Sequence, residues 1–192
     1  MAVEMGAETS DEALLLAYGQ GDRAAAQALT VRLAPLSYRL ACRMLRDEAE
    51  AEDVAQEAML RLWKIAPQWR VGEAKVSTWL YRVTSNLATD RLRKRRATSL
   101  DEAGDPADET LSVDEQMLEN QRAEALQWAL DQLPIRQKQA VILRHLEGLS
   151  NPEIAEAMET GVEAVESLTA RGKRALAALL RQRKDSLGYD RD

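Results

Sequence analysis

A group of aromatic, basic and amide side chains between residues 69 and 96 has the chemistry needed to bind nucleic acid. An indole ring can stack on an unpaired base, an amide can hydrogen-bond to a base edge, and guanidinium groups can neutralise phosphates. We interpret seven residues as candidates for this role: Trp69, Arg70, Arg82, Asn86, Thr89, Arg93 and Arg96. A second set follows at the end of the stretch as candidates for duplex phosphate contacts: Arg91, Arg93, Arg95 and Arg96.

One predicted helix carries most of these side chains. Residues 77–96 contain no Gly and no Pro, and Ser77 is a candidate N-cap. Apolar residues recur there at spacings of three and four and predict a buried stripe: Val76, Trp79, Leu80, Val83 and Leu87. Trp69 and Arg70 precede the helix in a segment whose Pro67 and Gly72 predict a loop. The pattern alone also fits a solvated amphipathic helix whose basic end suits the helix dipole.

A second predicted helix, residues 47–65, has six carboxylates in its first half: Asp47, Glu48, Glu50, Glu52, Asp53 and Glu57. Carboxylates in a first turn suit the helix dipole, but six exceed what capping requires. Two interpretations stay open at this point. One is a solvated acidic face, which is the usual fate of a charge run, and the other is a docking surface for a basic protein partner.

Composition narrows the class of protein. The chain has 192 residues, 45% of them hydrophobic, and no Phe, and its abundance of Ala and Leu favours an all-α fold. A net charge of −6 argues against a protein that coats nucleic acid indiscriminately. One Cys and one His predict no disulfide, no metal site and a cytoplasmic location, and the absence of a long apolar run predicts no membrane insertion. We expect no cofactor.

The chain divides into two predicted helical domains. Residues 1–97 form the first, residues 98–115 a flexible acidic linker, and residues 116–192 the second. In the second domain, Ser150 and Glu153 have the spacing of a capping box and open a short helix. A turn at 159–162 and a last helix from Glu163 to about Lys184 complete a helix-turn-helix pattern. Its outer face presents Glu163, Glu166, Ser167, Ala170, Arg171 and Arg174.

These motifs together resemble a bacterial RNA polymerase sigma factor of the extracytoplasmic-function (ECF) type, in the sigma-70 superfamily. The resemblance extends from about residue 12 to 182. Its most specific segments are residues 51–58 (AEDVAQEA) with Leu62-Trp63, residues 77–83 (STWLYRV) with Asn86, Asp90 and Arg93, and residues 133–155, which include Glu147-Gly-Leu-Ser150 and Ile154-Ala155.

The resemblance implies a division of roles. The first domain would bind the clamp of core RNA polymerase through Asp53, Gln56, Glu57 and Arg61, and the loop and following helix would read and open the −10 promoter element. The second domain would read the −35 element through the outer face of its helix-turn-helix. Implied partners are core polymerase (clamp and flap), double- and single-stranded promoter DNA, and an anti-sigma factor. Free of that inhibitor, we expect an extended chain with mobile domains.

Three departures from the family pattern leave the promoter sequence open. The turn has Glu159 where Gly is usual, and we expect Gly161 to supply the left-handed residue instead. No basic residue stands near Glu166 in the recognition helix, and Glu can accept from a cytosine amino group. The melting loop has Trp69 and Val76 where Phe is usual.

Three other classes of protein explain the features of this sequence less well than a sigma factor does. A ligand-responsive helix-turn-helix transcription regulator that never binds polymerase would need an apolar pocket, whereas the first domain is conspicuous for surface charge. A helical adaptor that binds only proteins does not explain the basic cluster beside Trp69. An enzyme is the weakest alternative, because the sequence shows no nucleophile–base pair, metal set or Gly-rich phosphate loop.

Overall fold

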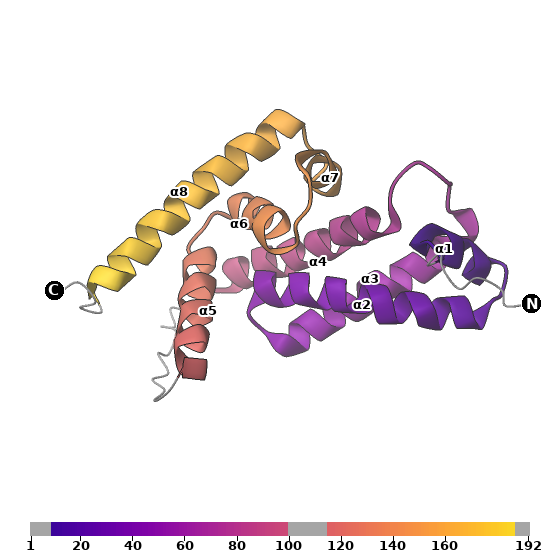
Figure 1. The fold of residues 1–192 in the computed structure, drawn as a ribbon, viewed down its shortest axis with the longest axis horizontal. Helices are drawn as coiled ribbons and strands as arrows, with labels where there is room; N and C mark the ends of the chain where they lie inside the picture. Colours follow the sequence, from indigo (N-terminus) through magenta and orange to yellow (C-terminus); the bar gives the residue numbers. More distant parts are fainter. Residues whose placement is uncertain (1–8, 100–114, 187–192) are drawn as a thin grey trace, which may run out of the picture.

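The computed structural model describes residues 9–99 and 115–186, and every regular element in this part of the chain is helical. The first domain comprises α1 (Asp11–Gly19), α2 (Arg23–Leu45), α3 (Glu48–Ile65), the short 3₁₀ turn η1 (Ala66–Gln68) and α4 (Val76–Ser99). The second comprises α5 (Glu115–Asp131), α6 (Ile135–Val141), the π-helical turn η2 (Ile142–Leu146), α7 (Asn151–Ala157) and α8 (Val162–Ser186). Figure 1 shows α7 lying against α4, with α8 on the outside. The all-α prediction is confirmed.

Side-chain caps set the starts of several helices. Ser10 accepts from the Ala13 amide at the start of α1, and Asp47 accepts from the Glu50 amide at the start of α3. The predicted Ser150 and Glu153 capping box is present in full at α7. The cap predicted at Ser77 is wrong, because α4 begins one residue earlier, at Val76.

Pro35 does not interrupt the first domain's long helix, because α2 continues through it to Leu45. A Pro inside a helix costs about 3 kcal/mol, because it removes a hydrogen bond and crowds the preceding turn. The continuous face of α2 outweighs that cost, since Leu29, Leu33 and Leu40 are almost completely buried on both sides of Pro35.

The core of the first domain lies between α1, α2, α3 and α4. Leu15, Leu29, Leu33, Leu62 and Leu80 form its centre. The predicted stripe of α4 faces this core: Val76 and Leu80 are buried, and Trp79, Val83 and Leu87 pack against it half-buried. The stripe therefore fixes which face of α4 points away from α2 and α3.

The two domains share a second hydrophobic core. It joins Met44, Val54 and Tyr81 of the first domain to Leu130 and Leu143 of the second. Our expectation of an extended chain is therefore wrong for this structure, in which η2 packs on α2 and α7 packs on α4. The predicted flexible acidic linker, residues 98–115, lies almost wholly outside the described residues, and its boundaries stay a prediction.

Candidate nucleic-acid and polymerase interfaces

The predicted melting loop runs from the end of η1 to the start of α4. Trp69 is half-buried there: its ring meets Trp79 edge-on, with centroids 6.2 Å apart, and its Nε1 donates to Glu12 at 3.3 Å. Arg70 is exposed and pairs with Glu73 of the same loop at 3.2 Å. The indole is thus held in a defined position, while the adjacent cation remains accessible to a ligand.

The predicted polar face of α4 turns away from the core of the first domain. Asn86, Arg93 and Arg96 are exposed on it, and Arg82 and Thr89 are half-buried. Arg93 pairs with Asp90 one turn earlier at 3.8 Å. All five predicted side chains of α4 therefore lie along one side of the helix.

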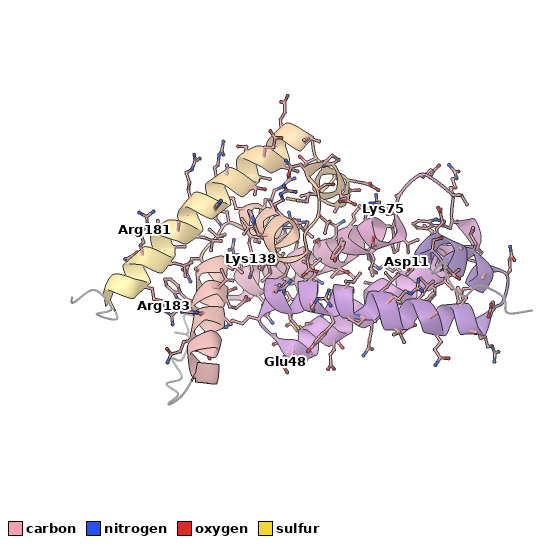
Figure 2. All side chains as sticks on the ribbon, in the orientation of Figure 1. Asp11, Glu48, Lys75, Lys138, Arg181 and Arg183 are labelled. Atoms are coloured by element: carbon pink, nitrogen blue, oxygen red, sulfur yellow. The ribbon has the colours of Figure 1, made fainter. Side chains whose placement is uncertain are left out.

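The second domain covers the start of this face. Glu153 of α7 lies 2.6 Å from Lys75, and Glu159, just after α7, lies 3.8 Å from Arg82. Figure 2 labels Lys75 at the base of the loop, where α4 begins beside α7. Carboxylates of the second domain therefore pair with two cations at the start of this face.

Two of the residues predicted to contact phosphates make bonds within the first domain in this structure. Arg91 donates to the backbone carbonyl of Glu50, and Arg95 bonds to the Leu45 carbonyl and to the carboxylates of Asp47 and Glu50. Both guanidiniums sit where the C-terminal end of α2 meets the acidic N-terminal turn of α3. That junction attracts cations through the orphan carbonyls of α2 and the carboxylates of α3. Arg91 and Arg95 therefore join α4 to its own domain.

The predicted polymerase-binding residues lie on the outer face of α3. Asp53 and Gln56 are exposed, and Glu57 and Arg61 form a pair one turn apart at 2.8 Å. Beside them an open apolar groove of about 680 Å³ runs between α2 and α3. It is lined by Thr30, Ala34, Pro35, Tyr38, Glu52, Ala55, Gln56, Met59, Leu60 and Trp63.

Sequence reasoning missed the apolar part of this surface. Leu60 is 54% exposed, although it is a large hydrophobic residue on a regular helix. The signal was present, because Leu60 falls outside the buried stripe that α3 uses for packing. The acidic face and the groove together form a surface that is charged at its edge and apolar in its centre.

The helix-turn-helix is built as predicted, apart from its turn. Glu163, Glu166, Ala170, Arg171 and Arg174 are exposed on α8, and Ser167 is half-buried. The left-handed residue is Glu159, with φ of 49°, while Gly161 does not have a positive φ. Our expectation for Gly161 was wrong because the position that follows α7 adopts the helix-terminating conformation directly, whatever residue stands there.

A buried carboxylate joins the domains through contacts that the sequence did not predict, although Glu147 lies within a segment that carries the family resemblance. Glu147, just after η2, accepts from Arg43 and from the Tyr81 hydroxyl, and Arg39 lies 3.8 Å away. Burial, followed by the nearby Glu147 charge, raises the pKa of Tyr81. Lys138, labelled in Figure 2, donates to the Met44 carbonyl at 2.7 Å and to Asp131 at 2.6 Å. Burial lowers the pKa of Lys138.

No helix among the described residues is long and apolar enough to cross a membrane. Two family models match the chain: Sigma-70 region 2 over residues 29–98, and Sigma-70, region 4, over residues 123–176. The first match includes nearly all of α4 and the loop before it, and the second includes α7 and the first part of α8.

Curated relatives and solved structures agree with these matches. The ECF RNA polymerase sigma factor SigM of Mycobacterium tuberculosis is 35% identical, over 90% of this chain and 86% of its own. SigW of Bacillus subtilis is 31% identical over 75% of this chain and 82% of its own.

Two solved structures share the fold. CnrH, solved with the cytosolic domain of CnrY, has a TM-score of 0.68 at 24% identity and covers 91% of this chain and 99% of its own. RpoE of Bartonella quintana, solved with the anti-sigma factor NepR, has a TM-score of 0.63 at 21% identity and covers 81% of this chain and 96% of its own. The chain belongs to the ECF family of RNA polymerase sigma factors, and it is an alternative sigma factor that directs transcription.

Proposed function

We propose that the chain divides the work of a sigma factor among three surfaces. The groove and acidic face of α3 bind core polymerase, the loop at Trp69 with α4 binds and opens the −10 element, and α8 reads the −35 element. The observation that carries the proposal is the position of Trp69. A half-buried indole is held in the loop that precedes a helix whose exposed face carries Asn86 and Arg93.

The role of Trp69 follows from an energy difference. Phosphate contacts exist whether or not the strands separate, so they favour docking and opening equally. Unstacking a base step costs a few kcal/mol, and only contacts that are absent from the duplex complex can offset that cost. A base–aromatic stack contributes about 1–3 kcal/mol. Trp69 therefore promotes strand opening, with Arg70, Arg82 and Asn86 contacting the released strand.

Replacing Trp69 by Ala tests this role. Closed-complex binding should stay near that of the wild type, while permanganate reactivity of −10 thymines falls about ten- to a hundredfold. Promoter DNA with a preformed bubble should restore transcription, because the unstacking cost is already met. Because Trp69 is half-buried, the thermal unfolding midpoint of the variant is measured in parallel. Undiminished opening on duplex promoters would remove Trp69 from the mechanism.

Polymerase binding is assigned to α3 because its charge and its apolar groove are both exposed there. A basic partner helix could contact Asp53 and Glu57 and place apolar side chains against Leu60.

Reversing both carboxylates, Asp53→Lys with Glu57→Lys, should lower core affinity and weaken its salt dependence. Leu60→Glu should lower affinity without that change in salt dependence. Glu124→Lys, an exposed charge reversal on α5, is the matched control. Unchanged affinity in both α3 variants would exclude this surface.

Promoter binding requires the two domains to separate. Glu153 and Glu159 occupy Lys75 and Arg82 in the packed arrangement, so DNA and the second domain compete for the same face of α4. The packed arrangement therefore corresponds to a chain that is not engaged with a promoter.

An anti-sigma factor is the proposed regulatory partner. Two proteins of the same fold were solved with such partners or with a partner's cytosolic domain. A partner that binds the packed arrangement would keep the −10 face covered by α7. The product of an adjacent gene, purified and added to the chain, should inhibit its binding to core polymerase. A partner that binds without inhibition would contradict this assignment.

A further inference from the structure

One oxygen atom of Glu12 ties two points of the melting loop together. Its Oε1 accepts from the Trp69 indole at 3.3 Å and from the backbone amide of Gly72 at 3.0 Å. The two donors are 57 and 60 residues away from Glu12 in the sequence. Gly72 has a φ of 82°, so the second bond is made at the left-handed residue of the loop. The contact therefore fixes both the aromatic side chain and the turn beside it.

Glu12 is itself held by a well-anchored helix. Leu15 of α1 is completely buried, and Arg32 of α2 donates to the Thr9 carbonyl at 2.6 Å just before the helix. At the other end, a Cβ on Gly19 would lie 3.1 Å from the Ala66 carbonyl oxygen, so α1 also packs closely on η1. The carboxylate of Glu12 is therefore a fixed point relative to the core of the domain.

Two contacts fix the Trp69 ring. Glu12 holds the edge that carries Nε1, and Trp79 contacts the ring at an interplanar angle of 81°. A hydrogen bond to a carboxylate is stronger than one to a neutral acceptor. A ring oriented before binding loses less freedom when a base stacks on it.

We infer that Glu12 is a positioning residue for promoter opening, which it promotes by holding Trp69 and the turn at Gly72 in the arrangement that receives the unpaired strand. This inference rests on the proposed role of Trp69. Glu12 acts through these two groups, since a carboxylate repels phosphate. It also lines a pocket of about 400 Å³ with Gly72, Lys75 and Ser77, whose shape depends on the loop it holds. Because α1 lies before residue 29, where the Sigma-70 region 2 match begins, the inference extends the opening apparatus beyond that match.

The test compares Glu12→Ala with Glu12→Gln in polymerase holoenzyme. Gln keeps an oxygen acceptor at the same distance along the side chain, whereas Ala removes it. Open-complex formation on a duplex promoter, read by permanganate, should fall about tenfold for Glu12→Ala and stay within about threefold of the wild type for Glu12→Gln. A preformed bubble should restore transcription by Glu12→Ala. A fold defect would not be restored by bubble DNA, so that result separates positioning from unfolding.

Asp11→Ala is the matched control. Asp11 belongs to the same helical turn and carries the same charge, but its bond is to Arg32 at 3.3 Å and not to the loop. The rate at which Asp11→Ala opens a duplex promoter should stay within about twofold of the wild type, since the loss of a surface charge alone should have little effect. Equal losses in Asp11→Ala and Glu12→Ala would overturn the inference.

Trp69→Phe tests the same contact from the other side. Phe keeps an aromatic ring but lacks the indole N–H. The double variant with Glu12→Ala should therefore lose less open-complex formation than the product of the two single fold-losses. If Glu12→Ala opens duplex promoters normally while Trp69→Ala does not, the inference is wrong and the proposed role of Trp69 stands. If Trp69→Ala also opens them normally, the proposed role of Trp69 fails and the inference fails with it.

Discussion

Arg43 of α2 binds the carboxylate of Glu147 across the domain interface, although 104 residues separate them in the sequence. The Glu147 side chain is only 1% exposed, and it also accepts from Tyr81 at 3.1 Å. When a buried carboxylate with several donors is removed, the largest cost in free energy comes from the donors that are left unpaired. Its removal leaves a guanidinium and a hydroxyl without their acceptor in a partly buried site.

Glu147→Ala should therefore weaken the packing of the two domains. We expect a loss of about 1–3 kcal/mol, below the figure for a fully buried pair, because the Arg43 side chain remains 30% exposed. Small-angle scattering of the free chain should show a larger radius of gyration for this variant. Glu124→Ala, at an exposed position of α5, should leave the radius unchanged. An unaltered radius for Glu147→Ala would mean that the apolar contacts alone hold the domains together.

The carboxyl of Glu153 should make the stability of the folded chain depend on pH, and the bond from Lys75 is the part of this effect that joins the two domains. A hydrogen bond from Lys75, reinforced by bonds from Ser150, lowers the pKa of Glu153 from 4.5 to about 2. A depressed carboxyl pKa contributes stability that is complete above about pH 4.5 and is lost as the pH falls towards 2. The NMR titration of the Glu153 carboxyl should shift upward in Lys75→Met. Titration at the wild-type pKa in that variant would show that Lys75 is not the cause.

Base preference at the −35 element should separate from general DNA affinity. Arg171→Ala and Arg174→Ala should weaken binding to all −35 sequences, because phosphate contacts carry little sequence information. Glu166→Lys should instead change the preferred base at one position, since a carboxylate accepts from cytosine and a cation does not. A selection from randomised −35 sequences measures both effects. The same preferred sequence for Glu166→Lys and the wild type would show that Glu166 contacts no base.

Gly172 should resist replacement, because α8 crosses α6 there. A Cβ at this position would lie 2.5 Å from Val141 Cγ2 and 3.3 Å from the Gln137 carbonyl. Val is stiff at χ1, so Gly172→Ala should destabilise the second domain by about 1–2 kcal/mol after allowing for the better helix propensity of Ala. Gly161→Ser, where a Cβ meets nothing within 4 Å, should be neutral in the same thermal unfolding experiment. Equal stability of both variants would contradict the close crossing.

Local patterns predicted the helices and the exposed faces, but they did not predict which charges pair. The capping box at Ser150 and the stripe at Val76 and Leu80 depend on spacing within one helix, so the sequence contains them in full. The ion pair between Arg95 and Asp47, in contrast, depends on how α4 crosses the start of α3. A run of cations looks the same in sequence whether it faces solvent, DNA or its own domain.

In the melting loop too, local sequence patterns identified a candidate residue but not its contacts. Trp69 stands out by its residue type beside cations, so its candidacy came from the sequence. Glu12 gave no such signal, since an acidic residue in a first helical turn is ordinary. Its two bonds to the loop span 57 and 60 residues and exist only because α1 packs on η1.

The packing of α7 on α4 has a thermodynamic consequence for the order of assembly. A ligand that binds only the separated domains must supply the free energy of separation, whereas a second such ligand does not supply it again. A separation cost of about 2.7 kcal/mol would lower the apparent affinity of the first ligand about a hundredfold. Polymerase and promoter DNA would then bind with positive cooperativity without touching each other, and each would raise the affinity for the other by the same factor. Isothermal titration with promoter DNA in the presence and absence of core polymerase would measure that factor directly.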